Sequence, residues 1–323
     1  VALYVVRGRG CWSTRRIIGL GGLLGLCALT KLQTYTAGAF AAYALYYEAT
    51  EGSFKLKHIA KRWWSWFALA ILVAVAVLSP WLVRNGLTYG WNDLLGLHRH
   101  DAVVLGQLTT AEYLAMNGWV ALLKAFFTTT FHSFWGQFGW MGVVLDRRIY
   151  QLYGLLCLVA VSGIVLGWLR KRRAGTYIDG YALGLLSVWL VVTTLGYLWW
   201  NLSYVQHQGR YLFPALLPIC VGLAWGAEQA LRVHPEAKSY RAYSPQAILG
   251  LTCGAILSLF SWLANTLSRF DVALLVGSMV GLPVLACIRR RLGAIIWGVV
   301  WGGLVLLDIY ILYWQILPAL TQS

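Results

Sequence analysis

The chain has 323 residues, of which 59% are hydrophobic and 11% are charged, whereas a soluble domain carries about 25% charged residues. This composition excludes an ordinary soluble globular protein and indicates a membrane protein with several spans. The net charge of +15 does not indicate nucleic-acid binding, because the basic residues form short clusters beside apolar runs, as in cytoplasmic loops that face anionic lipid.

The first residues, Val1 to Val6, are apolar and are followed by Arg7 and Arg9. We expect them to be the last turns of a helix whose beginning lies upstream. The six cysteines are scattered through apolar runs without a CxxC pair, so we expect small core residues and neither a disulfide framework nor a zinc site.

Apolar runs long enough to cross a bilayer predict an all-α polytopic membrane protein with about nine membrane segments. Two short runs, 17–30 and 34–47, flank Lys31 and are expected to form a hairpin of abbreviated helices. The other seven segments are expected at 63–83, 149–169, 181–199, 211–231, 247–267, 272–288 and 292–314.

If each predicted segment crosses the membrane once, most Lys and Arg residues lie in loops on the same side of it. The positive-inside rule makes that side cytoplasmic. The hairpin tip at Lys31, a large loop at 84–148 and the stretch 201–210 then share the outer face. Within the large loop, the spacing of apolar residues predicts a helix over 110–130, lying flat in the membrane interface. Thr109 or Thr110 is its expected N-cap, and Glu112 lies in its first turn.

Two domains are expected. The first is a membrane core at 1–231, N-terminally incomplete and carrying the outer loop 84–148, and the second is a three-helix membrane segment at 246–323. The polar linker 234–245 separates them.

A polar segment at 201–214, NLSYVQHQGRYLFP, stands between two apolar runs and is the leading candidate for ligand contact. Arg210 offers a planar fork of donors suited to phosphate, and Gly209 allows the backbone to approach a ligand closely. His207 and Gln208 add hydrogen-bonding groups. The alternative is an interfacial cap in which Arg210 extends to lipid phosphates.

Three other groups were weighed. His98, His100 and Asp101 could hold a divalent metal, although a solvated loop is the simpler interpretation. Lys31 could meet a lipid phosphate or mark the turn of the hairpin. Asp308 is an acid deep inside a predicted span, so it is either a functional residue or the partner of a Ser or Trp in an interhelical hydrogen bond.

Several motifs together resemble the bacterial members of the GT-C superfamily, the membrane glycosyltransferases related to protein mannosyltransferases (family 39) that use dolichyl- or polyprenyl-phosphate sugars. The resemblance covers about residues 20–231. Its motifs are LLGLCALTKLQT at 23–34, WLVRN at 81–85 with the Tyr-Gly pair at 89–90, DAVVLGQLTT at 101–110, SFWGQFGW at 133–140 and QGRYLFP at 208–214.

The resemblance implies a cavity at the outer face of the bacterial inner membrane, where a polyprenyl-phosphate-linked sugar meets an acceptor and no cofactor is needed. It implies donor-phosphate contacts from Lys31, Arg84 and Arg210. A cavity lining is expected from His207, Gln208, Tyr211, Trp135 and Trp140. The catalytic acid is expected upstream of residue 1. No GxSxG, Walker, HExxH or Rossmann motif points elsewhere, and the chain has only 11 Asp and Glu residues.

Two alternatives remain beside the enzyme. One is a non-catalytic GT-C-like subunit that helps to build a larger membrane complex, and the other is a transporter of a lipid-linked saccharide. Transport would predict paired broken helices in two related halves, which the sequence does not display. The expected partners are the polyprenyl-phosphate sugar, the lipid bilayer and membrane-complex subunits, and nucleic acid is not expected.

Overall fold

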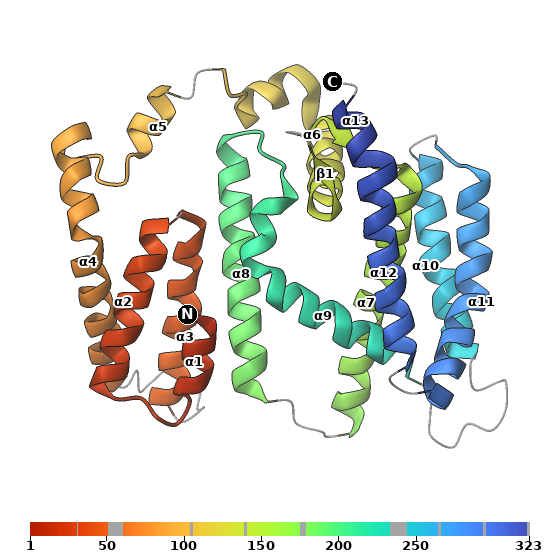
Figure 1. The fold of residues 1–323 in the computed structure, drawn as a ribbon, viewed down its shortest axis with the longest axis horizontal. Helices are drawn as coiled ribbons and strands as arrows, with labels where there is room; N and C mark the ends of the chain where they lie inside the picture. The colour runs from red at the N-terminus through yellow and green to blue at the C-terminus, as the bar shows by residue number, and fades with distance from the viewer. Residues whose placement is uncertain are drawn as a thin grey trace. The chain divides into compact units, whose positions relative to one another are not determined.

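The computed structural model describes residues 1–30, 32–50, 61–103, 106–138, 141–174, 179–232, 244–263, 266–292 and 295–321, and it is 86% helical (Figure 1). The fold class is therefore all-α, as predicted. The chain forms two compact units. Unit 1 contains Val1–Thr128 and Ile178–Pro218, and unit 2 contains Thr129–Tyr177 and Ile219–Ser323. The domain division expected from the sequence separates the chain elsewhere and stays a prediction.

The helices and strands follow one another along the chain with short connections. They are α1 Ala2–Gly8, α2 Thr14–Thr30, η1 Leu32–Tyr35, α3 Thr36–Ala49, α4 Lys61–Tyr89, α5 Leu97–Val103, α6 Thr110–Trp135, β1 Gln137–Phe138, β2 Val143–Val144, α7 Arg147–Ala174, α8 Gly180–Ser203, η3 Gly209–Ala215, α9 Leu216–Ala230, α10 Ser244–Leu263, α11 Arg269–Leu292, α12 Ile295–Ile311, the π-helical turn η5 Leu312–Ile316 and α13 Leu317–Thr321.

Seven helical segments among the described residues are long and apolar enough to cross a membrane. They are Lys61–Tyr89, Arg147–Arg172, Gly180–Ser203, Gly209–Ala230, Pro245–Trp262, Arg269–Ile288 and Gly302–Ala319. In the most apolar window of the first, 6% of the residues are buried inside the protein, so this helix presents an apolar surface to its surroundings, as lipid-facing helices do.

The predicted count of nine is not confirmed. The predicted hairpin is present as α2 and α3, joined through η1, but these helices have 17 and 14 residues and are too short to be counted with the seven. The other predicted spans each overlap one of the seven. Their ends differ by at most six residues, except that the last span begins at Gly302, ten residues later than predicted.

In unit 1, α2 lies against α4 through a Gly-x-x-x-Gly pair, the spacing that lets membrane helices approach closely. A Cβ placed on Gly21 would come within 2.7 Å of the Cβ of Val73, and one on Gly25 within 2.7 Å of the Cβ of Val77. The contacts advance together along both helices, so α2 and α4 run parallel. The buried core of the unit joins residues of α1, α2, α3, α4 and α8.

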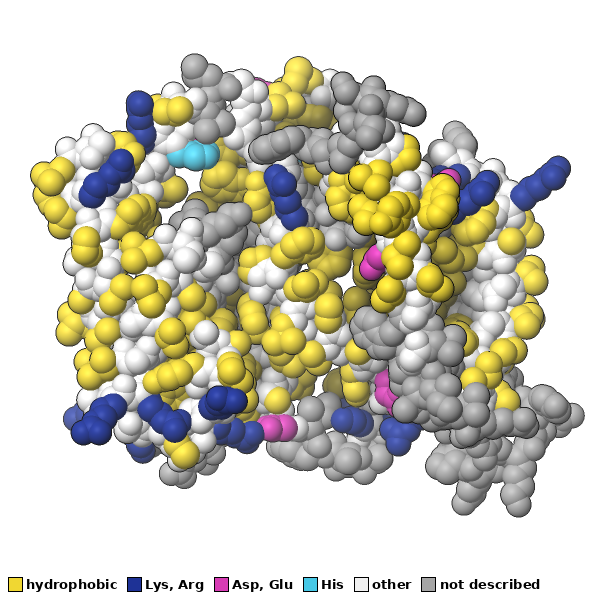
Figure 2. Space-filling model, in the orientation of Figure 1, with side chains coloured by type: hydrophobic (Ala, Val, Ile, Leu, Met, Phe, Trp, Pro, Cys, Tyr) yellow, Lys and Arg dark blue, Asp and Glu magenta, His cyan; other side chains and the backbone are white. Residues whose placement is uncertain are grey.

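Basic side chains share the end of unit 1 at which α2 and α4 begin (Figure 2). Arg15 and Arg16 stand in the first turn of α2, and Lys61 and Arg62 start α4. Arg9 belongs to the same end, because it pairs at 2.7 Å with Asp179, the N-cap of α8. This gathering agrees with the charge pattern read from the sequence.

Unit 2 uses the same device twice more. A Cβ on Gly163 of α7 would meet the backbone of Gly226 in α9 and lie 2.9 Å from the amide nitrogen of Ala230. A Cβ on Gly250 of α10 would lie 3.0 Å from the amide nitrogen of Met279 in α11. Glycine-mediated contact therefore joins one helix pair in unit 1 and two in unit 2.

The helix predicted at 110–130 is present as α6, which extends to Trp135 and bends at Gly118, where φ is 77°. Its predicted N-terminus is confirmed. The amide of Glu112 donates to the hydroxyl of Thr109 at 3.2 Å, and the amide of Thr109 donates to the Glu112 carboxylate at 2.9 Å, which is a reciprocal capping box. Its position in the membrane interface stays a prediction.

Candidate functional site

The polar segment 201–214 leaves α8 as extended chain and re-enters helix at η3. The amide of Val205 donates to the carbonyl of Leu108 at 3.0 Å, and Tyr204 forms a β-bridge with Thr109. The segment is thus anchored on the residues just before α6. Both segments that form this contact belong to unit 1.

The buried part of the polar segment is a pair formed by Asn201 and His207, which are 6% and 5% exposed. Nδ1 of His207 lies 2.7 Å from Oδ1 of Asn201, while Nδ2 of Asn201 donates to the carbonyl of Tyr197 at 2.9 Å. The Asn201 oxygen can only accept, so Nδ1 carries the imidazole proton. Burial lowers the pKa of His207, which favours this neutral form.

The neutral form of His207 leaves Nε2 as a bare acceptor. This atom is buried and has no hydrogen-bond partner within the described residues, and the same holds for Oε1 of Gln208. Phe126 of α6 covers the imidazole edge to face at a centroid distance of 5.2 Å. Two buried acceptors without partners call for donors such as an ordered water or the hydroxyl groups of a ligand.

Arg210 and Tyr211 lie at the exposed side of the segment. Arg210 is exposed, with its guanidinium carbon 5.8 Å from the centroid of the Tyr211 ring. The Tyr211 hydroxyl donates to Oε1 of Gln206 at 2.8 Å, which fixes the ring. The Arg210 fork is therefore presented to the surroundings of the segment, as a contact for an anion requires.

A cavity of ≈ 580 Å³ lies within unit 1 beside this segment. Its wall combines the last turns of α8 with the end of η1, the starts of α3 and α5, and η3. The lining residues are Tyr35, Thr36, Leu95, Leu97, Val192, Thr193, Leu195, Gly196, Tyr197, Trp199, Trp200, Tyr211 and Pro214. This volume and apolar, aromatic lining are typical of sites for apolar ligands.

Thr193 is one of two threonines in the described cavity wall, the other being Thr36. It is 3% exposed, and its hydroxyl has no hydrogen-bond partner among the described residues. Gly196 lies one helical turn further along α8, and a Cβ built on it would meet nothing within 4 Å. The cavity therefore has open space next to this glycine.

Arg84 forms hydrogen bonds within the protein. Its Nη1 donates to Oδ1 of Asn85 at 3.0 Å and to the hydroxyl of Tyr89 at 2.9 Å. Asn85, 2% exposed, donates in turn to the carbonyl of Leu94 at 2.9 Å. Arg84 thus helps to hold the turn that carries Leu95 into the cavity wall, and neither Arg84 nor Arg210 is among the described residues that line the cavity.

His98, His100 and Asp101 do not form a metal-binding group, and no cluster of three His, Cys, Asp or Glu side chains occurs in the described ranges. Instead, Nδ1 of His100 lies 3.1 Å from the Asp101 carboxylate, and its ring stands edge to face on Trp200 at 5.8 Å. Hydrogen bonds from His100 and Tyr204 lower the pKa of Asp101.

The remaining predicted site residues fall outside the cavity or outside the described residues. Lys31 and Trp140 belong to the latter group. Trp135 stacks on Tyr153 at 4.4 Å and packs on a core cluster of unit 2 around Ile149. Of the five side chains expected to line a cavity, the described lining includes Tyr211. The convergence of Lys31, Arg84 and Arg210 stays a prediction.

Most of the cavity wall was not anticipated from the sequence. Its α8 residues, Thr193, Gly196, Tyr197 and Trp200, recur at spacings of three and four, which places them on one helix face. The signal was available, because this face combines a hydroxyl, a glycine and aromatic rings within an apolar span. The high hydropathy of α8 by itself predicts an ordinary span and hides this pattern.

Comparison of the chain with protein-family models, with curated proteins and with solved structures finds no match.

Proposed function

We propose that the chain is a membrane glycosyltransferase that transfers a sugar from a polyprenyl-phosphate-linked donor to an acceptor at the outer face of a bacterial inner membrane. One observation carries the proposal, namely that an apolar cavity of ≈ 580 Å³ in a membrane-spanning unit borders a segment with an exposed Arg and unused acceptors. Tyr211 belongs to both the cavity wall and the segment.

This combination matches the three chemical parts of the proposed donor. Isoprenoid carbon atoms suit the aromatic wall, the phosphate suits the guanidinium of Arg210, and the sugar hydroxyls suit Nε2 of His207 and Oε1 of Gln208. Attack of an acceptor oxygen at the anomeric carbon breaks its bond to the phosphate oxygen. The phosphate leaves with the electron pair, and a nearby cation stabilises the charge that develops.

The acceptor hydroxyl must lose its proton as it attacks, which calls for a general base. The described cavity lining contains no Asp or Glu. The proposal therefore places this base outside the described cavity wall. The same observation favours the second candidate function, a non-catalytic subunit that binds the lipid-linked sugar within a larger complex.

The proposal fixes the topology. The basic end of unit 1, with Arg15, Lys61 and neighbouring cations, faces the cytoplasm by the positive-inside rule. The polar segment then faces outwards, α2 and α3 add two short crossings to the seven long spans, and α6 lies in the outer interface. Cysteine-accessibility labelling on the two sides of the membrane measures this arrangement directly.

The test is sugar transfer by the full-length protein in vesicles with a radiolabelled polyprenyl-phosphate sugar. Arg210→Ala is expected to abolish transfer without affecting membrane insertion. Arg62→Ala is the matched control, since Arg62 is exposed at the opposite end of unit 1 and stacks on Trp66 at 4.2 Å. Equal turnover of both variants would refute the proposed site. Donor binding without transfer by the wild type would favour the non-catalytic subunit.

A further inference from the structure

The last long helical run of the chain carries an acid at its centre. α12, η5 and α13 are continuous from Ile295 to Thr321, and Asp308 stands 13 residues from either end. At 1.5 Å per residue, each end is about 20 Å away, whereas the apolar core of a bilayer extends only about 15 Å from its midplane. Asp308 therefore lies too deep for its side chain to reach the membrane surface.

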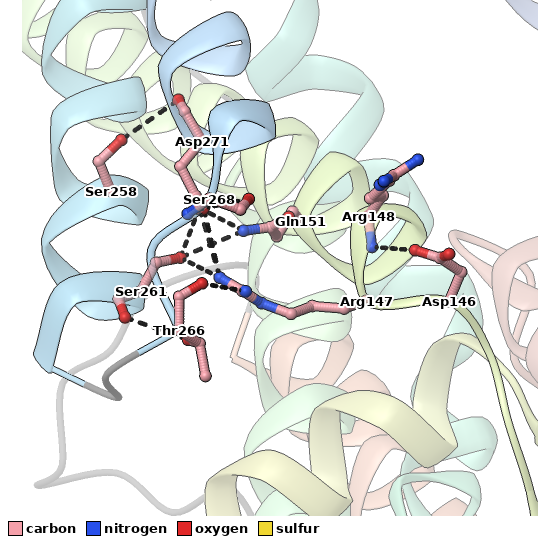
Figure 3. Close-up of polar contacts among 9 residues, drawn as sticks. All are labelled: Asp146, Arg147, Arg148, Gln151, Ser258, Ser261, Thr266, Ser268 and Asp271. Carbon is pink, nitrogen blue, oxygen red and sulfur yellow. Dashed lines mark hydrogen bonds and ion pairs between the residues drawn. The ribbon is translucent and has the colours of Figure 1, made fainter.

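The protein satisfies another acid in a span completely. The side chain of Asp271, at the start of α11, is fully buried, and Figure 3 shows the polar side chains around it. Its carboxylate accepts from the hydroxyl of Ser261 at 2.6 Å, from the amide of Ser268 at 2.7 Å and from the side chain of Gln151, and it pairs with Arg147 at 3.4 Å. This network lies within unit 2 and gives the Asp271 carboxylate a structural role.

Asp308 has no comparable network. Its side chain is exposed, and within the described part of the chain no hydrogen bond or ion pair reaches its carboxylate. The phenol of Tyr153 in α7 is close enough to interact electrostatically with it, but a neutral phenol supplies no balancing charge. The packed side of α12 is formed instead by Leu307 and Ile311, which contact the core cluster of unit 2.

The open side of α12 begins at Asp308. Val305 and Ile309 are 55% and 44% exposed, and a Cβ on Gly298 or Gly302 would meet nothing within 4 Å. At about 100° per residue, these residues and Asp308 fall within an arc of about 120°, the width of one helix contact. An unpaired charged acid at mid-bilayer depth costs about 2.5–3.5 kcal/mol, so a cover that supplies positive charge would stabilise this face.

We propose that this face of α12 docks a transmembrane helix of another protein that carries a Lys or Arg at mid-bilayer depth, paired with Asp308. Charge complementarity identifies the partner. A second copy of this chain does not provide it, because the Lys and Arg residues of the seven described spans stand near the span ends. The pairing is independent of the cavity in unit 1 and of sugar transfer.

The experiment uses the full chain, reconstituted in phosphatidylcholine vesicles with synthetic transmembrane helices of Leu and Ala. One peptide has a single central Lys and the other has Leu at that position, and energy transfer between labels measures association. The Lys peptide is expected to bind the wild type about tenfold more tightly than the Leu peptide. Asp308→Asn is expected to remove this preference. Asp146→Asn, which changes an exposed acid outside the spans, is expected to keep it.

The reversed pair gives a second, independent readout. Asp308→Lys is expected to prefer a peptide with a central Glu over the Lys peptide, because the charges are exchanged. Equal affinity of the wild type for the Lys and Leu peptides would overturn the proposal, as would a Lys preference that survives Asp308→Asn. Self-association that depends on Asp308 would assign this face to a second copy of the chain instead.

Discussion

Filling the cavity from Gly196 is the sharpest test of its role. A Cβ at Gly196 meets no atom within 4 Å, so a larger side chain can enter the cavity without displacing the wall. Gly196→Leu also replaces a poor helix former by a good one, which favours α8 by about 0.8 kcal/mol. The variant is therefore expected to fold at least as well as the wild type.

The loss of ligand binding can be estimated from the volume that the new side chain takes. Leucine adds four carbon atoms to the cavity and excludes about as many ligand carbons. At about 0.8 kcal/mol for each buried CH₂, Gly196→Leu should weaken binding by about 3 kcal/mol, or roughly 100-fold in Kd. Equilibrium binding of a radiolabelled polyprenyl phosphate to the purified protein measures this change.

Two variants control the experiment. Gly22→Leu makes the same substitution in α2, also with nothing within 4 Å of the new Cβ but outside the cavity wall, and should leave Kd unchanged. Gly196→Ala adds one carbon atom and should weaken binding only slightly. Unchanged affinity in Gly196→Leu, with thermal stability retained, would refute the assignment of the cavity to the lipid chain.

Three other predictions concern stability and chemistry. Gly163→Ala should destabilise the protein by about 1–3 kcal/mol, because its methyl group meets the backbone of Gly226, whereas Gly277→Ala, which meets nothing within 4 Å, should not lower the melting temperature. Burial lowers the pKa of His207, so its contribution to stability is present above the unfolded value of about 6.5 and lost below it. Melting in detergent between pH 7.5 and 5.5 should thus fall less in His207→Gln than in the wild type. Asp101→Asn should keep sugar transfer within about twofold, because a carboxylate with a lowered pKa is a weak base, and a large loss would make Asp101 the missing acid.

The membrane helices could be predicted because hydropathy is a local property of the sequence. The hairpin of α2 and α3 and the helix α6 also followed from residue spacing. The N-cap was predicted as Thr109 or Thr110, and the structure shows Thr109 in a capping box with Glu112. The number of membrane spans was predicted less accurately. Whether a helix crosses a bilayer depends on the distance between its polar ends, and α2 and α3 are shorter than a full crossing. Helix-to-helix contacts were missed, although the Gly-x-x-x-Gly pairs that mediate them are visible in the sequence.

The candidate site was predicted in part. The polar segment was found because hydrogen-bonding residues interrupt an apolar context. The partner of His207 was not found, because Asn201 was seen as the start of a loop, whereas the last turn of α8 holds it in place for the imidazole. The GT-C resemblance implied a phosphate contact for Arg84. Its two neutral partners, Asn85 and Tyr89, become apparent only when the end of α4 is folded.

The bend of α6 at Gly118 has a mechanical consequence for the polar segment. Before the bend, the hydroxyl of Thr110 donates to the carbonyl of Asn201 at 2.7 Å, and after it Phe126 covers His207. The parts of α6 before and after the bend therefore both contact the polar segment. A change in the bend at Gly118 would therefore change the position of Asn201 relative to His207, so a molecule that alters the bend would also act on the acceptors of the polar segment.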